Sequence, residues 1–263
     1  MKIMVFGANG MQGRYLIKYF ESKYTVIPVT RNQLDLATAT ARQVSALILA
    51  HRPNLIVNAA GVIKHRSYNI LDMIAVNTAF PHVAARAAQE IGCKFIHMTT
   101  DCVFSGRKGD YDEEDAHDCL DDYGKSKSLG EPTLATVIRT SIIGEELDNK
   151  LSLIEWAKSQ RGKRVRGFTD HRWNGVTCLE FAKLVDRMIE QDNFWQGVRH
   201  VHSPNAVNKF ELLTMINAAF DLELDIVPYQ SSVCWRDLAS IYSNPVQLSL
   251  EQQLVELREF KLE

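Results

Sequence analysis

The chain has 263 residues, of which 46% are hydrophobic and 24% are charged, as is typical of a globular protein. Its 30 basic and 32 acidic residues leave a net charge of −2, which gives no support for binding of nucleic acid. No apolar run reaches the roughly 18 residues that a membrane span needs, and the first six residues lead into a strand rather than a signal peptide. The five cysteines are odd in number and widely spaced, which favours reduced thiols. We therefore expect a cytoplasmic protein without membrane contact.

Alternating strand and helix patterns follow from the N-terminus. Short apolar runs predict strands at 3–6, 24–29, 54–58, 94–98 and 136–139. Amphipathic or alanine-rich stretches predict helices at 13–22, 41–51, 71–91 and 122–131. This β-α-β alternation predicts an α/β fold with a doubly wound parallel sheet of the Rossmann type.

The pattern changes near Gly144. Further helices are predicted at 151–159, 179–191 and 209–220, with a strand at 197–202. The basic stretch 161–166 is interpreted as a solvated turn and edge strand, with a phosphate contact as the alternative. We expect a dinucleotide-binding domain over residues 1–143. Residues 144–263 should form mainly a smaller, interleaved α/β substrate-binding part, from which segments can return to the first domain.

The seven residues after the first predicted strand have the pattern G-x-x-G-x-x-G, and a helix follows them at once. A dinucleotide-binding fingerprint requires this strand–loop–helix context. Glycines let the backbone approach a pyrophosphate, and the helix N-terminus offers unpaired N–H groups and a partial positive charge. The alternative is a glycine-rich turn without a ligand. The residues expected to bind the cofactor here are Gly7, Asn9, Gly10, Met11, Gln12 and Gly13.

The second predicted strand should end beside the adenosine ribose of the cofactor. An acidic residue there binds the 2′-hydroxyl of NAD, whereas an arginine accommodates the 2′-phosphate of NADP. Here Arg31 follows the strand, and no carboxylate comes before Asp35. The sequence therefore favours NADPH, with NADH as the alternative cofactor and an exposed arginine without a ligand as the alternative role.

Tyr123 and Lys127 are four residues apart in a predicted helix, so both side chains lie on one helix face. A nearby ammonium lowers the pKa of a phenol, which then exchanges a proton with a carbonyl oxygen more readily. Thr100 ends a predicted strand, and the carboxyl ends of parallel strands face the ligand crevice. A surface Tyr–Lys pair is the alternative.

These residues lie in motifs that occur together in one family. The motifs are the glycine loop, N-A-A-G at 58–61, V-N at 76–77, T-T-D-C-V-F-S-G at 99–106, Y-G-K-S-K at 123–127 and R-T-S at 139–141. The motifs occur in the order typical of the extended short-chain dehydrogenases/reductases, which the chain resembles. Among these it is most similar to the nucleotide-sugar reductases of the dTDP-4-dehydrorhamnose reductase family. The resemblance covers residues 1–145 well and the remainder loosely.

The resemblance implies an NADPH-dependent reductase of a 4-keto nucleotide-activated deoxysugar. Thr100, Tyr123 and Lys127 would be catalytic, with Lys127 also holding the nicotinamide ribose. Asn77 would take part in a proton relay through water. The further residues implied at the cofactor are Arg31, Asp35, Leu36, Ala59, Ala60, Gly61, Val62, Ile63, Asn77, Met98, Tyr123 and Lys127. Those implied at the nucleotide sugar are Thr100, Asp101, Cys102, Ile142, Asn174 and Arg236, the last at the diphosphate.

The chain departs from the family pattern at three points. The family has a tyrosine where this chain has Cys102 and a tryptophan where it has Ile142, and the chain is shorter. The two substitutions fall near the sugar pocket, so a related 4-keto sugar, such as an amino sugar, is at least as compatible as the rhamnose precursor. A regulatory subunit of methionine adenosyltransferase is an alternative because it shares the fold. A nucleotide-sugar epimerase or dehydratase is another, although Cys102 replaces the acidic residue that a dehydratase carries.

Other features are interpreted as structural. The pair His200 and His202 lacks a third ligand at suitable spacing, so no metal site is expected. The acidic run at 110–122 is interpreted as a solvated loop, with magnesium binding as the weaker alternative. Trp173 is a candidate for stacking on a nucleobase. A homodimer is a possible assembly.

Overall fold

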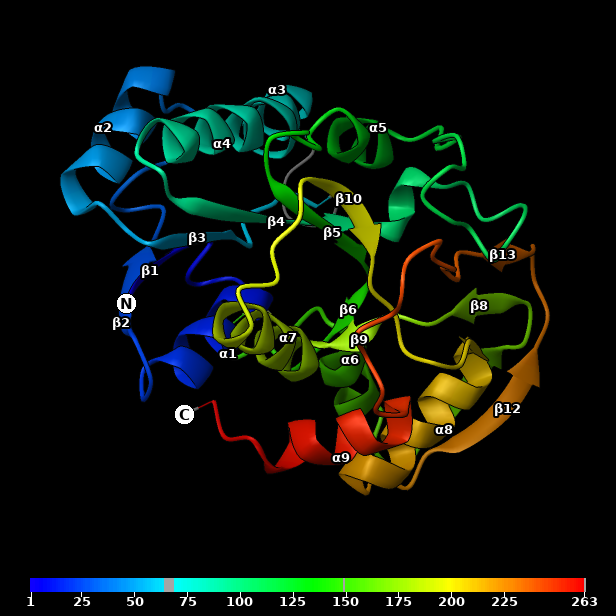
Figure 1. The fold of residues 1–263 in the computed structure, drawn as a ribbon. Coiled ribbons are helices and arrows are strands. Elements are labelled where there is room, and N and C mark those ends of the chain that lie inside the picture. The colour runs from blue at the N-terminus through cyan, green and yellow to red at the C-terminus, as the bar shows by residue number, and fades with distance from the viewer. Residues whose placement is uncertain (64–68, 149, 263) are drawn as a thin grey trace.

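The computed structural model describes residues 1–63, 69–148 and 150–262. At its centre is a parallel sheet of six strands in the order β10-β5-β4-β3-β1-β2 (Figure 1). The strands are β1 (Lys2–Phe6), β2 (Thr25–Val29), β3 (Leu55–Asn58), β4 (Lys94–Thr100), β5 (Thr136–Thr140) and β10 (Gly197–His200). The strand order reverses between β1 and β3, and ligands of such sheets bind beyond the carboxyl ends at this point. The expected α/β fold with a doubly wound parallel sheet is confirmed.

Helices cover both faces of this sheet. Figure 1 shows α2, α3, α4 and α5 on one face and α1 and α7 on the other. Their bounds are α1 (Met11–Phe20), α2 (Ala41–His51), α3 (Ile70–Met73), α4 (Phe80–Glu90), α5 (Asp122–Ser128) and α7 (Cys178–Glu190). The single helix expected over 71–91 is formed by α3, a π-helical stretch η1 (Ile74–Ala79) and α4 in succession. A 3₁₀ turn, η2 (Asp101–Val103), follows β4 directly.

The central strands β1 and β3 are apolar along most of their length because both of their faces are buried. Ile3 and Val5 of β1 pack with Leu16 of α1 and Phe181 of α7 in one core cluster. The side chains between them point the other way, so that Met4 and Phe6 belong to the cluster under α2 and α4.

The C-terminal part contributes smaller sheets around a third core cluster, to which α6, α8 and α9 contribute. Its helices are α6 (Leu153–Ser159), α8 (Lys209–Phe220) and α9 (Leu250–Glu259). Its strands are β6 (Ile142–Ile143), β7 (Arg164–Phe168), β8 (His171–Trp173), β9 (Val176–Thr177), β11 (Val207–Asn208), β12 (Asp225–Tyr229) and β13 (Cys234–Trp235). The basic stretch at 161–166 enters β7, which pairs with β12 alone, as an edge strand does. Helix α9 was not expected from the sequence.

Strand β10 returns from the C-terminal part to the edge of the main sheet, where it pairs with β5. Hydrogen bonds from a buried guanidinium stabilise this edge of the sheet. Arg139 on β5 donates to Nε2 of His200 (2.7 Å), to Nε2 of His117 (2.6 Å) and to Oε2 of Glu131 (2.7 Å). Burial and the neighbouring Arg139 lower the pKa of His200 to about 4, so its ring is neutral and can accept this bond. His200 is thus structural, as expected.

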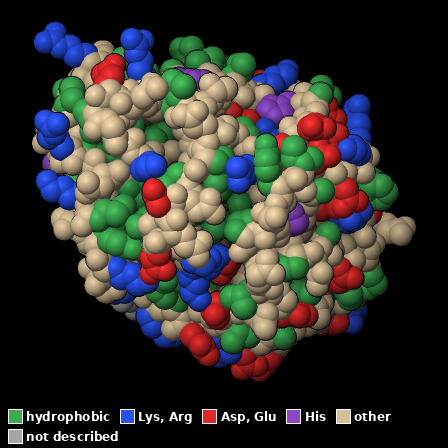
Figure 2. All heavy atoms as spheres, in the orientation of Figure 1, with side chains coloured by type: hydrophobic (Ala, Val, Ile, Leu, Met, Phe, Trp, Pro, Cys, Tyr) green, Lys and Arg blue, Asp and Glu red, His purple; other side chains and the backbone are tan. Residues whose placement is uncertain are grey.

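Basic and acidic side chains are interspersed over the face shown in Figure 2. None of the helices in the described part of the chain combines the length and apolar character of a membrane span. All five cysteines are free thiols.

Candidate active site

The glycine loop lies between β1 and α1, where two glycines are required by close packing. A side chain at Gly13 would place its Cβ 2.1 Å from the carbonyl oxygen of Gly7, and one at Gly7 would come within 2.7 Å of the backbone nitrogen of Ala60. Gly7 also has a φ of +77°, which favours glycine. Helix α1 follows from Met11, and its N-cap residue, Gly10, supplies no side-chain cap. The first N–H groups of α1 are therefore suited to an anion such as a pyrophosphate.

Two residues of this loop differ in what they can offer a cofactor. Asn9 is exposed. Gln12 is buried, and its side chain donates to the carbonyl oxygen of Cys178 (3.1 Å). This hydrogen bond joins α1 to the start of α7. The backbone N–H of Gln12, and not its side chain, is therefore the group that we expect to bind the cofactor.

The turn after β2 carries the residue expected to select the cofactor. Arg31 is exposed, two residues beyond the end of the strand. Asp35 is half-buried and accepts a hydrogen bond from the backbone of Ala37 (3.1 Å). Leu36 packs on the core under α2 and α4. A guanidinium is therefore available at this edge of the sheet.

The segment after β3 is held by two asparagines. Asn58 Oδ1 accepts from the backbone nitrogen of Ala60 (3.0 Å). The side chain of Asn77, in η1, accepts from Val62 N (2.8 Å) and donates to Val62 O (2.9 Å) and to Ser126 Oγ (3.0 Å). These three hydrogen bonds of the Asn77 amide thus join the segment after β3 to α5. This arrangement does not support the relay role that the resemblance implies for its side chain.

Thr100, Tyr123 and Lys127 are brought together at the carboxyl end of β4. Thr100 ends that strand, where its hydroxyl donates to Asp101 Oδ1 (3.1 Å) and accepts from Cys102 N (3.1 Å). Helix α5, whose N-cap is Asp121, presents Tyr123 and Lys127 to this point. Burial raises the pKa of Tyr123, and a hydrogen bond with Thr100 opposes that rise.

Lys127 lies beneath the tyrosine and is only 4% exposed. Its ammonium donates to the carbonyl oxygen of Met98 (3.0 Å). Burial lowers the pKa of Lys127 to about 8, with Glu131 acting in the opposite direction. The pKa of Tyr123 is raised, and not lowered as expected beside Lys127, because burial is the largest influence on the phenol. The phenol therefore carries its proton at neutral pH.

Two cations approach the same place from the C-terminal part. Arg236 donates from Nη1 to Cys102 Sγ (3.5 Å). Burial raises the pKa of the Asp101 carboxyl, and the charges of Arg236 and Lys209 oppose this. Burial lowers the pKa of Lys209, whose ammonium lies 4.9 Å from the centroid of the Trp173 ring. Lys209 was missed in the sequence, where only its position after Asn208, the N-cap of α8, marks it.

Three residues near the expected sugar pocket have structural partners. Asn174 donates to Leu238 O (2.7 Å) and accepts from Leu238 N (2.8 Å), so its amide fastens the segment that carries Arg236. Trp173 is 5% exposed and belongs to the third core cluster, which corrects its expected role of stacking on a nucleobase. Ile142 is half-buried and packs between two core clusters.

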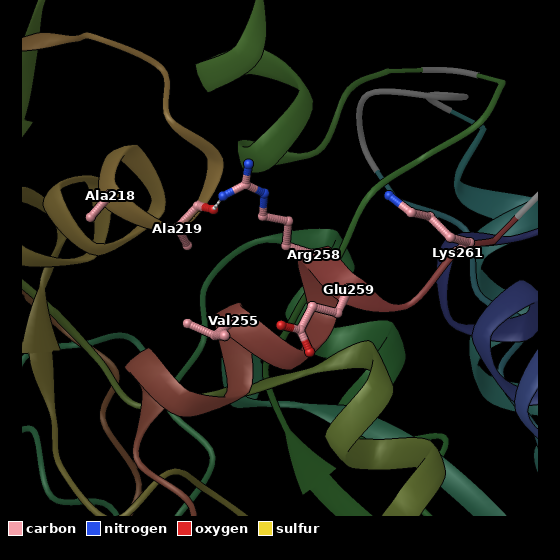
Figure 3. A pocket seen from close by; sticks show the side chains of 6 residues that line it. All are labelled: Ala218, Ala219, Val255, Arg258, Glu259 and Lys261. Carbon is pink, nitrogen blue, oxygen red and sulfur yellow. Dashed lines mark hydrogen bonds between the residues drawn. The ribbon is translucent and has the colours of Figure 1, made fainter.

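Within the residues that the structure describes, no group of three or more His, Cys, Asp or Glu side chains could hold a metal ion. A groove also lies between α8 and α9, away from the residues above (Figure 3). Its lining residues are Ala218, Ala219, Val255, Arg258, Glu259 and Lys261. Arg258 bridges the two helices by donating to Ala219 O (2.8 Å).

Comparisons with known proteins give a consistent picture. The family described as RmlD substrate binding domain matches residues 1–238. A dTDP-4-dehydrorhamnose reductase of Aggregatibacter actinomycetemcomitans is 25% identical over 270 residues, covering 95% of this chain and 90% of the relative. Methionine adenosyltransferase 2 subunit beta of Danio rerio is 28% identical over 241 residues, covering 84% of this chain and 74% of the relative.

Solved structures agree on the fold. A dTDP-4-dehydrorhamnose reductase from Clostridium acetobutylicum superposes with a TM-score of 0.81 at 20% identity, over 98% of this chain and 99% of the other. The enzyme of that name from Bacillus anthracis, solved in complex with NADP, gives a TM-score of 0.81 at 20% identity, over 97% and 98% of the two chains.

Proposed function

Because the chain belongs to the RmlD substrate-binding domain family, we propose that it is an NADPH-dependent reductase of a 4-keto nucleotide-activated deoxysugar. The observation that carries this proposal is the meeting of Thr100, Tyr123 and Lys127 at the carboxyl end of β4. That end of the sheet also carries the glycine loop, so the proton donor and the expected cofactor site face one crevice.

The residues present fit a dinucleotide. Gly7 and Gly13 let the loop pack closely on itself and on residue 60, as the tight turn of a dinucleotide site requires, and the uncapped start of α1 offers N–H groups to a pyrophosphate. Arg31 would contact the 2′-phosphate, and Lys127 would hold the nicotinamide ribose. NADPH, when bound, supplies the hydride that reduces the keto carbon.

The protein's own part in the reaction is to bind the carbonyl oxygen and to protonate it. Thr100 would donate a hydrogen bond to that oxygen, and Tyr123 would transfer its phenolic proton to it as the charge develops. The raised pKa of Tyr123 keeps this proton in place before the reaction. The ammonium of Lys127 would stabilise the phenolate that remains.

The other side of the crevice would recognise the substrate. Asp101 would accept hydrogen bonds from sugar hydroxyls, while Arg236 and Lys209 would bind the diphosphate, since two cations suit two phosphate groups. Cys102 is smaller than the tyrosine of the family pattern. This favours a sugar whose substituents differ from those of the rhamnose precursor.

On this proposal residues 1–143 form the dinucleotide-binding domain, and most of residues 144–263 form the substrate-binding part. Strand β10 and helix α7 are the segments of the second part that join the first. We place the reaction in the cytoplasm, in keeping with the free cysteines.

The decisive experiment is a screen of 4-keto nucleotide sugars with NADPH, followed at the absorbance of the nicotinamide. At least one of them should be reduced by the wild-type protein and hardly at all by Tyr123→Phe. Oxidation of NADPH that is equally fast in both proteins would contradict the assignment.

A second candidate function follows from the relative in Danio rerio, a methionine adenosyltransferase subunit. A regulatory subunit would bind a catalytic subunit of that enzyme and alter its activity. Such an effect should be unchanged in Tyr123→Phe, whereas reduction should be lost.

A further inference from the structure

Two buried polar atoms lie on the face of β4 that packs against α4 and α5. They are Nε2 of His97, whose side chain is fully buried, and Oγ1 of Thr99, whose residue is 3% exposed. Neither atom has a hydrogen-bond partner among the residues that the structure describes. Buried polar groups in native proteins are nearly always paired, either with protein or with ordered water. Buried water is a common partner of such atoms where protein groups supply none.

The neighbours of His97 fix which of its nitrogens carries the proton. Asn58 Oδ1 accepts from Ala60 N (3.0 Å), which turns the Asn58 NH₂ group towards His97 Nδ1 at 2.9 Å. Nδ1 is therefore the acceptor, and the proton of the neutral ring lies on Nε2. Burial, together with the charge of Lys127, lowers the pKa of His97 well below its usual value and keeps the ring neutral. His97 thus presents a buried N–H donor.

The catalytic lysine lies beside this donor. His97 and Thr99 point to the same face of β4 because side chains two residues apart do so. Lys127 reaches the carbonyl oxygen of Met98, the residue between them (3.0 Å). That bond takes one of the three N–H groups of the ammonium. Since the Asn77 amide is committed to Val62 and Ser126, it is His97 and Thr99 that offer free hydrogen-bonding capacity next to the lysine.

We propose that His97 and Thr99 hold buried water beside Lys127 and thereby act as positioning residues for that lysine. The water accepts from His97 Nε2–H, donates to Thr99 Oγ1 and uses a lone pair to solvate the ammonium.

The charged and titratable groups around Lys127 set the direction of the expected change. Glu131, just beyond α5, raises the pKa of Lys127. Lys127 and His82 of α4 both act electrostatically on His97, which indicates that these three groups lie near one another. Water that accepts from the ammonium stabilises its charged form. Loss of this water should therefore lower the pKa of Lys127 further below the value of about 8.

The test uses the ligand-free protein and two variants of nearly unchanged shape, Thr99→Val and His97→Phe. A high-resolution crystal structure of the wild type should show solvent density about 3 Å from both His97 Nε2 and Thr99 Oγ1, and Thr99→Val should lack it. NMR titration of the Lys127 side chain should give a pKa that is lower by about one unit, or a tenfold change in proton affinity, in either variant.

Thr136→Val is the matched control because Thr136 is also buried, on the next strand, and its hydroxyl bonds to Trp195 O (2.6 Å). It should leave the pKa of Lys127 unchanged. Absence of density at both atoms, or an unchanged lysine pKa in Thr99→Val, would overturn the proposal. Neither readout needs a substrate, so a chain that proved not to be a reductase would leave this result standing. If reduction is observed, its alkaline limb should move to lower pH in the same two variants.

Discussion

The two sides of the proposed crevice are built in different ways. On the side of the main sheet, Thr100 ends a strand, and the helix that carries Tyr123 and Lys127 begins 22 residues later. On the other side, Arg236 is positioned by contacts with distant segments. Its backbone donates to Arg172 O (3.2 Å), and the residue before it donates to Gly106 O (2.7 Å). The proposed catalytic groups are therefore placed by one strand and one helix of the main sheet, whereas the proposed recognition groups are placed by contacts between more distant segments.

This difference predicts that substitutions on the two sides of the proposed crevice alter different kinetic constants. Changes on the sheet side should act on the reaction step, and changes on the C-terminal side should act on substrate binding. Uniform binding alters KM alone, whereas interactions made only in the transition state alter kcat.

The largest effect is expected from Tyr123→Phe. The variant keeps the ring and its packing but removes the proton that the carbonyl oxygen needs. We expect kcat to fall by about 10²–10⁴-fold, with the dissociation constant of NADPH nearly unchanged. Tyr111→Phe is the control, because Tyr111 is also a buried tyrosine and stacks on Phe104. The Tyr111→Phe protein should keep the kcat of the wild type. Wild-type turnover in Tyr123→Phe would remove the catalytic assignment.

A smaller effect of another kind is expected from Arg236→Ala and from Lys209→Ala. Each removes a cation from the proposed diphosphate site, and a hydrogen bond to a charged group contributes about 1.5–3 kcal/mol. KM should rise by roughly 10–100-fold, with a smaller change in kcat. Arg258→Ala removes the same charge at the groove between α8 and α9 and should change neither constant. An unchanged KM in both variants would make these residues structural.

Lys127→Met should raise stability while it lowers activity. The pKa of Lys127 is lowered from 10.5 to about 8 by burial, so the folded state bears a penalty for the charge. That penalty is complete below pH 8 and disappears as pH rises from 8 to 10.5, where the unfolded chain binds more protons.

Denaturant unfolding of Lys127→Met at pH 7 should therefore give a free energy of unfolding higher by about 2 kcal/mol. Lys158→Met is the opposite control. Ion pairs with Glu145 and Glu155 raise the pKa of Lys158, so its loss should lower stability. Equal losses of stability in the two variants would contradict the buried-charge argument.

The smallest effect concerns the choice of cofactor. Arg31→Asp should weaken the binding of NADPH relative to that of NADH. The ratio of the two dissociation constants should change by only about tenfold, because the guanidinium is exposed and screened by solvent. Arg86→Asp, on the exposed face of α4, is the control for the change in charge. Equal affinities of the wild type for both cofactors would remove the role of Arg31.

The same comparison explains what could be predicted from the sequence. The parallel sheet follows from apolar runs and glycines, and these are local signals. The grouping of Thr100, Tyr123 and Lys127 was expected because sheet topology brings strand ends together. The pairing of Asn174 with Leu238 could not be predicted, because it joins residues 64 positions apart. Lys209 was missed for the same reason, since nothing local shows that the start of α8 faces Asp101.

The return of β10 to the sheet has a consequence in time. Arg139 meets His200 only 61 residues later in the chain, and ribosomes add about 5–20 residues each second. For roughly 3–12 seconds of synthesis the nascent chain therefore holds Arg139 without this partner, and β5 remains an open strand edge. During this interval, before the last strand of the six-stranded sheet emerges, the edge at β5 is open to pairing with another chain.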